Sequence, residues 1–266
     1  MNKLYTNTGK CIWCGKKEPE TTFYTAPHIL PKRLGGLETG FDVCDECNHY
    51  FGTAEQIGRP CMDHAFKEVF GAIRMFTSQL GPDSYKKFRS AYFSYHHEGH
   101  LIKIKRNFNS HAVTRQFKRS LYEVFLQKYH QFTGDGNNNI FSMVRDFARY
   151  DIGNPHVFYA YNNVILSPDD NTKEHPFLPM SQKLIDDMFE YGYFNFWLMG
   201  HNFYLEIFPT IASIKEYSYL QNQANHTLIS AHGNEAIYEF NDISQIDFFM
   251  QRFNSQVPRY VFFDSI

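Results

Sequence analysis

The chain has 266 residues, of which 43% are hydrophobic and 18% aromatic, which is enough apolar material for one or two folded domains. No uninterrupted apolar run approaches the roughly 20 residues that a membrane-spanning helix requires, and the first ten residues lack the apolar core of a secretory signal. Membrane and secreted classes are therefore disfavoured, and we expect a cytoplasmic protein with no membrane partner.

The net charge of −2 conceals an uneven distribution along the chain. Residues 1–60 are balanced, with seven basic and seven acidic side chains. Residues 61–135 carry twelve basic against six acidic side chains, whereas residues 136–266 carry seven against fifteen. A locally basic segment can meet phosphates even though the whole chain is slightly acidic, so nucleic acid is not excluded as a partner.

Two Cys-x-x-Cys pairs mark the amino-terminal part, Cys11 with Cys14 and Cys44 with Cys47. Each two-residue spacer lets both sulfurs of a pair face one centre, so four thiolates can surround one tetrahedral zinc ion. Thiols used in this way are typical of a reducing cytoplasm. Twenty-nine residues separate the two pairs, which is long for a simple zinc ribbon and indicates that the intervening hairpin carries something more.

That hairpin contains His28 in the run HILPKRLGG, and the second pair continues as CDECNHYFG. Together with CIWCG, these motifs resemble an HNH endonuclease of the zinc-stapled ββα-metal type over roughly residues 9–56. The resemblance implies a metal-dependent DNA endonuclease, that is, a hydrolase of phosphodiester bonds. It also implies that His28 is the general base, that Asn48 ligates a catalytic Mg or Mn ion, and that the four cysteines hold a structural zinc.

The residue types suit this chemistry. A neutral imidazole can take a proton from water at neutral pH, and Mg²⁺ prefers oxygen ligands such as the Asn48 amide. Members of the resembled family usually carry an acidic ligand immediately before the base, and here that position is Pro27. A substitute such as Asp42, His49 or Glu55 would then complete the site. The alternative is a catalytically degenerate zinc module that binds nucleic acid or a protein partner without cleavage.

In chain order, residues 1–60, which we call the finger, are expected to form a zinc-bound ββα-metal domain. A short strand at 21–24 should lead to the base, and a helix should follow the second cysteine pair within residues 42–56. Lys32 and Arg33 flank the base and are candidates for contacts with DNA phosphates. A solvated surface pair is the alternative.

Next, the basic part of the chain shows helical periodicity. Apolar residues recur at three- and four-residue spacing from 63 to 80, and a second short helix is expected from Ser84 to about Tyr95. Residues 101–106 alternate like a half-exposed strand. Ser110 is the expected N-cap of the strongest helix, at about 112–132.

Basic side chains of this part are predicted to bind the DNA backbone. The predicted patch consists of Lys103, Lys105, Arg106, Arg115, Lys118 and Arg119. Each phosphate contact would steepen the log–log salt dependence of binding by roughly 0.9 on duplex DNA. A merely solubilising face is the alternative.

The remaining acidic, strand-rich part predicts an α+β domain that mixes helices with antiparallel strands. Together with the basic helical part it forms one larger domain over residues 61–266, behind the finger. The expected elements are a flexible loop at 134–139, helices at 140–150, 181–191 and 243–253, a strand at 156–166, hairpins at 194–208 and 227–240, and a β-prone tail at 260–263.

The biological setting is predicted only coarsely. Chains that couple such a finger to a second domain of their own resemble bacterial restriction or anti-phage effectors, which points to antiviral defense. A mobile-element or repair nuclease is the alternative. DNA is the expected partner, and the second domain would recognise a target, close a homodimer or contact an accessory protein.

Overall fold

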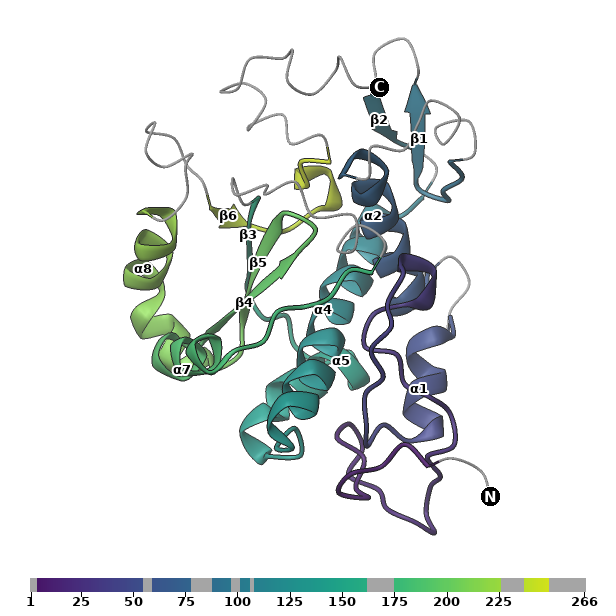
Figure 1. The fold of residues 1–266 in the computed structure, drawn as a ribbon. Helices are drawn as coiled ribbons and strands as arrows, with labels where there is room; N and C mark the ends of the chain where they lie inside the picture. Colours follow the sequence, from purple (N-terminus) through teal and green to yellow (C-terminus); the bar gives the residue numbers. More distant parts are fainter. Residues whose placement is uncertain are drawn as a thin grey trace.

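The computed structural model describes residues 4–54, 59–77, 88–96, 101–105, 108–161, 175–225 and 237–248. At its centre lies a four-stranded antiparallel sheet in the order β4-β5-β3-β6, and a two-stranded sheet, β1-β2, stands apart from it. Helices lie on both sides of the larger sheet (Figure 1). The predicted α+β class, with helices and antiparallel sheets mixed, is confirmed.

The larger sheet is built around a tight hairpin. Strand β4 (Tyr193–Leu198) pairs with β5 (His201–Glu206), and Met199 and Gly200 between them both have positive φ angles, 50° and 81°. Two such residues are typical of the turns that match the twist of a two-residue hairpin. The hairpin predicted at 194–208 is therefore confirmed.

The other two strands extend the sheet beyond β5. Strand β3 (Val157–Tyr161) lies antiparallel to β5 on one side and to β6 (Tyr238–Glu239) on the other. β3 confirms the start of the strand predicted at 156–166, and β6 falls inside the hairpin predicted at 227–240. The other residues of those two predictions lie outside the described part, apart from His156 just before β3 and Ile237 and Phe240 beside β6.

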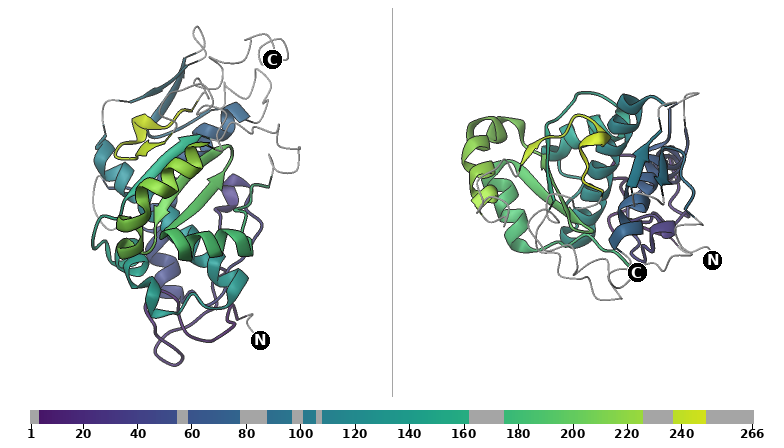
Figure 2. Two further views of the ribbon diagram at one scale, coloured as in Figure 1. Left: turned by 90° about the vertical axis from the view of Figure 1, so that its left-hand side faces the viewer. Right: turned by 90° about the horizontal axis from the view of Figure 1, so that it is seen from above.

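Helices bury the two faces of this sheet against separate apolar clusters (Figures 1 and 2). On one face α4 (Ser110–Thr133) packs Phe117 against Phe203 of β5, with 5.5 Å between ring centroids. On the other face α8 (Pro209–Asn225) stacks Tyr219 on Tyr193 at 5.3 Å. α8 was not predicted from the sequence.

Two shorter helices complete these layers. α5 (Ser142–Tyr150) packs beside α4, and α7 (Gln182–Tyr191) packs against β4 and α8. The Ser181 side chain accepts a hydrogen bond from the Leu184 amide, so the predicted cap of α7 is confirmed. The helix predicted at 140–150 is confirmed as α5, preceded by a 3-10 turn at Asn139–Phe141.

Helix α4 is the central element of the fold. Its side chains are buried on every face from Val113 to His130, apart from half-buried Arg115, because the sheet, α5, α2 and the finger surround it. The expected helix is confirmed, but its cap is Asn109, whose side chain accepts from the Ala112 amide, rather than Ser110. The exposed basic face expected on this helix is not present.

The finger contains less regular structure than expected. Helix α1 (Asp45–Gly52) confirms the helix predicted behind the second cysteine pair. The prediction of a strand at 21–24 is wrong, because the main chain of this segment forms hydrogen bonds with the first residue of α1 instead. The Asp45 amide donates to the Thr22 carbonyl at 2.8 Å, and the Asp45 carboxylate accepts from the Thr25 amide at 2.7 Å. Within the described residues of the finger, isolated β-bridges such as that between His28 and Thr39 take the place of the expected β-strands.

Helix α2 (Met62–Thr77) and the small sheet follow the finger. α2 confirms the predicted helix, whose last residues, 78–80, lie outside the described part. The helix expected from Ser84 to Tyr95 is wrong over its described residues, because β1 (Phe93–His96) pairs with β2 (Leu101–Ile104). β2 confirms the strand predicted at 101–106.

The carboxyl-terminal predictions fare unevenly. A 3-10 turn at Ile243–Gln245 replaces the start of the helix predicted at 243–253, and residues 246–248 are not helical. Asp242 and Gln245 cap this turn reciprocally, which satisfies its backbone within a single turn. Residues 249–253 and the predicted tail at 260–263 lie outside the described residues.

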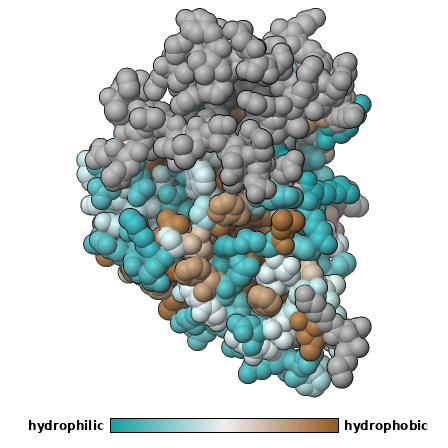
Figure 3. Space-filling view, in the orientation of Figure 1, coloured by the Kyte–Doolittle hydropathy of each residue, from teal (hydrophilic) through white to brown (hydrophobic). Residues whose placement is uncertain are grey.

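One apolar cluster joins the finger to the rest of the chain. Trp13 packs edge-on against Phe51 at 5.0 Å, and both belong to the same buried cluster as Phe66 of α2 and Phe117 of α4. The boundary at residue 60 stays a prediction. Exposed apolar residues are interspersed with polar ones on the coloured part of the face in Figure 3, as is usual for a protein surface. Over the described residues, every helix is too short or too polar to cross a bilayer.

Candidate active site

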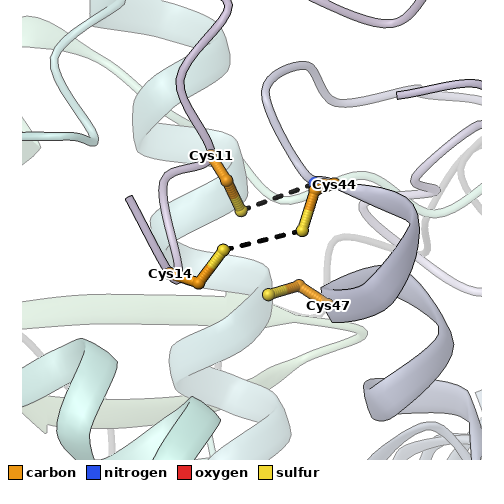
Figure 4. A group of neighbouring side chains, drawn as sticks. All are labelled: Cys11, Cys14, Cys44 and Cys47. Atoms are coloured by element: carbon orange, nitrogen blue, oxygen red, sulfur yellow. Dashed lines mark hydrogen bonds between the residues drawn. The ribbon is translucent and has the colours of Figure 1, made fainter. Parts of the chain in front are cut away.

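The four cysteines of the finger converge on one point. Their sulfur atoms all lie within 4.8 Å of one another, with Cys14 Sγ 3.6 Å from Cys44 Sγ (Figure 4). A tetrahedral zinc ion with Zn–S bonds of 2.3 Å would hold its sulfurs about 3.8 Å apart. The cluster can therefore hold a zinc ion, as the spacing predicted. Cys44 is the N-cap of α1 and Cys47 lies in its first turn, so the metal would fix the start of this helix.

The thiols are close enough to share protons. The pKa of Cys14 is lowered to about 7, chiefly because Cys11 donates a hydrogen bond to its sulfur. The same contact raises the pKa of Cys11. Zinc replaces these protons when it binds, because thiolate is the form that coordinates metal.

Arg149 of α5 contacts the cysteine cluster from outside the finger. Its Nε donates to Cys47 Sγ at 3.4 Å, and its guanidinium lies 3.9 Å from the ring centroid of Tyr50. A zinc ion with four thiolates carries two negative charges, so a cation that also donates to one sulfur offsets part of that charge. The sequence offers no sign of this role, since 102 residues separate Arg149 from Cys47.

His28 forms an isolated antiparallel β-bridge with Thr39. The Ile29 amide donates to the Glu38 carbonyl at 3.2 Å and the Gly40 amide donates to the Pro27 carbonyl at 2.7 Å, which fixes the backbone on both sides of His28. The imidazole is half-buried, and its Nδ1 atom is itself buried and has no hydrogen-bond partner among the described residues. The lone pair of this nitrogen is therefore not taken up by another described group of the protein.

The surroundings of His28 keep its imidazole neutral. Burial lowers its pKa, and the positive charge of Lys32 lowers it further. The negative charge of Asp63 and the Glu38 carbonyl act in the opposite direction but are outweighed. His28 therefore has the protonation state that a general base needs at neutral pH.

Asn48 lies on α1, directly after Cys47. It is half-buried, and its side-chain amide forms no hydrogen bond with the described part of the chain. Its backbone amide donates to the Cys44 carbonyl at 2.9 Å. The helix thus holds Asn48 in place through its main chain and leaves the amide oxygen available to a hard cation.

Of the three substitute ligands expected for the missing acid, Asp42 does not fit this role. Asp42 is fully buried and its carboxylate already accepts from the amides of Asn7, Thr8 and Gly9 and from His130 Nε2. The suggestion that it ligates a cation is wrong for this reason. His49 is exposed and contacts Thr53 Oγ1 at 3.3 Å, and Glu55 lies outside the described residues.

Part of the predicted DNA-binding set is exposed and part is not. Lys32 and Arg33 are exposed in the 3-10 turn η1 (Lys32–Leu34), a few residues after His28, and Lys103 is exposed on β2. Lys105 is half-buried and its Nζ donates to the Ser90 carbonyl at 2.6 Å. Arg106 lies outside the described residues.

Arg119 is a buried structural residue rather than an exposed phosphate ligand. Only 2% of it is exposed, and its guanidinium donates to the carbonyls of Phe147 and Ala148, to Gln116 Oε1 and to the Tyr50 hydroxyl. Every end of the guanidinium is thus taken up within the protein. The expected exposure of Arg119 is wrong, because α4 is covered on all sides.

The two neighbouring cations of α4 are also withdrawn from the surface, since Arg115 is half-buried and Lys118 is buried. Arg115 Nε lies 2.7 Å from the Asp151 carboxylate, which Arg59 also approaches at 2.6 Å. Lys118 is buried, and burial lowers its pKa to about 8. The patch predicted on α4 is therefore wrong in its placement, and Arg115 and Lys118 are not surface phosphate ligands.

Residues 11–57 match the family model of the HNH endonucleases. The resemblance drawn from the sequence is confirmed. The match spans both cysteine pairs, His28 and Asn48, and HNH domains as a family are nucleases, which indicates a nuclease-type function acting on nucleic acid. Neither the comparison with curated proteins nor that with solved structures found a match for the chain.

Proposed function

We propose that the protein is a metal-dependent HNH-type DNA endonuclease that hydrolyses phosphodiester bonds. The supporting observation is a half-buried, neutral His28 with an unpartnered ring nitrogen, located inside the HNH segment between its two cysteine pairs in the sequence. The proposed cofactors are a structural zinc on the four cysteines and a catalytic Mg or Mn ion. Asn48 is proposed to ligate the catalytic ion through its amide oxygen.

In the proposed mechanism His28 takes a proton from a water molecule. The water oxygen forms a bond to phosphorus, the bond between phosphorus and the 3′ oxygen breaks, and the leaving oxygen gains a proton from solvent. A bound divalent cation supplies positive charge for the phosphate and the leaving oxygen. Asn48 would hold that cation through its amide oxygen, and Lys32, Arg33 and Lys103 offer exposed positive charge to neighbouring phosphates.

Incubation of supercoiled plasmid with the protein in Mg²⁺, Mn²⁺ or EDTA tests this proposal. We expect nicking that depends on the cation and that is abolished in His28→Ala. His111→Ala is the matched control, because this exposed imidazole lies at the start of α4, outside the finger, and has no role in the proposed mechanism. Cleavage by His28→Ala at the wild-type rate would refute the assignment of the base.

A second candidate function is a catalytically degenerate zinc module that binds nucleic acid or a protein partner. The observation that favours it is buried Pro27, which offers no carboxylate immediately before His28. A mobility shift of DNA without nicking in any cation decides for this alternative. If the protein neither nicks nor shifts DNA, the remaining interpretation is that the module binds a protein partner.

For the cellular role we propose only a general class. A restriction or anti-phage effector in the cytoplasm fits a nuclease segment joined to a larger domain of its own. Expression in a phage-sensitive host, compared with the His28→Ala variant, tests the defence role through plaque counts. A homodimer or an accessory protein as partner stays a prediction.

A further inference from the structure

The proposed cation lacks an evident acidic ligand within the finger. Pro27 stands where a carboxylate would be expected, and its carbonyl accepts from the Gly40 amide. The Asp42 carboxylate is fully used by three backbone amides and His130. Mg²⁺ is usually bound through one or two carboxylates together with water, so an amide oxygen alone is a poor site.

A carboxylate approaches the same side of α1 from the neighbouring helix. Asp63 lies in the first turn of α2, which packs against α1. Its Oδ2 atom lies 3.9 Å from the point that a Cβ atom on Gly52 would occupy. Gly52 follows Asn48 by four residues, and side chains at this spacing lie on one face of a helix, about 6 Å apart at Cβ. The Asp63 carboxylate therefore lies beside the face of α1 that carries Asn48.

The charge of Asp63 is largely available. Its described partner is Lys67, one turn along α2, at 3.4 Å, and 38% of the Asp63 side chain is exposed. A contact of this length in an exposed i,i+4 pair is weak and is easily exchanged for a divalent cation. Asp63 also acts on the base, since its negative charge raises the pKa of His28.

We propose that Asp63 of α2, together with Asn48 of α1, ligates the catalytic divalent cation in place of the acid missing at Pro27. This inference rests on the proposed endonuclease function, which it deepens. Carboxylate and amide oxygens are hard donors that suit Mg²⁺ and Mn²⁺, whereas the thiolates of the cysteine cluster suit zinc. The site is then completed by residues on both sides of residue 60, so the finger alone would bind the cation poorly.

Titration of the zinc-loaded full-length protein with Mn²⁺, followed by electron paramagnetic resonance of the free ion, tests this proposal without any cleavage assay. Asp63→Asn keeps the shape of the side chain and removes its charge. We expect it to weaken Mn²⁺ binding by at least about tenfold, since even partners of metal ligands have effects of this size. Asp146→Asn, an exposed residue of α5, is the matched control and should bind as the wild type does.

Lys67→Gln supplies a test with the opposite sign. Removing the ammonium group that contacts Asp63 should tighten Mn²⁺ binding severalfold if Asp63 is a ligand, and the effect should vanish in the Asp63→Asn background. Equal melting temperatures across the variants would show that they fold alike.

The outcomes separate this inference from the proposed function. Wild-type Mn²⁺ affinity in Asp63→Asn, or absence of Mn²⁺ binding by the wild type, would overturn the assignment of Asp63. Mn²⁺ binding that depends on Asp63 in a protein that cuts no nucleic acid would support the cation site and refute the endonuclease.

Discussion

The carboxylate of Asp42 and the imidazole of His130 form a buried pair, with Oδ2 2.8 Å from Nε2, that joins the finger to the central helix α4. The Gly136 amide donates to His130 Nδ1 at 3.0 Å, so Nε2 carries the proton and donates to Asp42. Asp42 in turn holds the backbone of residues 7–9. A buried, fully hydrogen-bonded carboxylate thus helps to fix the hairpin that carries His28 to α4.

We expect Asp42→Asn to destabilise the protein by about 3 kcal/mol, because an amide cannot accept from all the donors that surround this site. Burial by itself raises the pKa of Asp42, but hydrogen bonds from His130, Thr8 and Asn7 outweigh it and hold the pKa below its usual range. Urea denaturation measures the change in the free energy of unfolding.

The same pair predicts a pH dependence. A carboxyl group whose pKa is depressed in the folded state contributes stability above its unfolded pKa of about 4, and this contribution is lost as the pH falls below that value. The difference in stability between wild type and Asp42→Asn should therefore be constant near pH 7 and shrink on acidification. A difference that grows at low pH would contradict the depressed pKa.

Replacing Arg149 should weaken zinc retention. Arg149→Leu removes both the positive charge and the N–H donor on Cys47 Sγ, and we expect zinc to transfer to a chromogenic chelator about tenfold faster. Arg149→Lys keeps the charge but loses the planar donor, so its rate of zinc transfer should lie between those of the wild type and Arg149→Leu. Arg33→Gln, which removes an exposed cation elsewhere in the finger, should leave the rate unchanged.

The acid limb of the pH–rate profile should report His28. Burial and the charge of Lys32 lower the pKa of its imidazole, so kcat/KM for plasmid nicking should persist to lower pH than the pKa of an exposed histidine allows. Lys32→Gln removes one of the two lowering effects and should shift the acid limb to higher pH. A shift to lower pH would show that Lys32 does not act on the base through its charge.

Variants of Lys103 and Arg119 distinguish a residue that binds DNA at the surface from one that stabilises the fold. Lys103→Ala should reduce the log–log salt slope of DNA binding by about 0.9, the value for one lost phosphate contact. Arg119→Met should leave the slope unchanged and lower the free energy of unfolding by roughly 3 kcal/mol, since it removes several buried hydrogen bonds. A reduced slope in Arg119→Met would restore Arg119 to the binding surface.

Local chemistry determined a large part of this protein from the sequence alone. The spacing of the two cysteine pairs predicted a common metal site, because two-residue spacers force sulfurs to one side of each turn. Apolar periodicity predicted α2 and α5, and turn residues predicted the β4–β5 hairpin. In each case residues close in sequence carry the signal, so no knowledge of distant packing was needed.

Only the tertiary structure decided which polar residues are available for chemistry. Arg119 looked like a surface cation, yet the layers around α4 enclose it. The GDGNNN run predicted flexibility, whereas Gly136 lies where an added Cβ would come within 2.7 Å of His130 Cβ. Asp63 gains its position beside α1 only because α2 packs there. Contacts between residues far apart in the chain set burial and charge at these positions, and the sequence pattern around each residue carries no record of them.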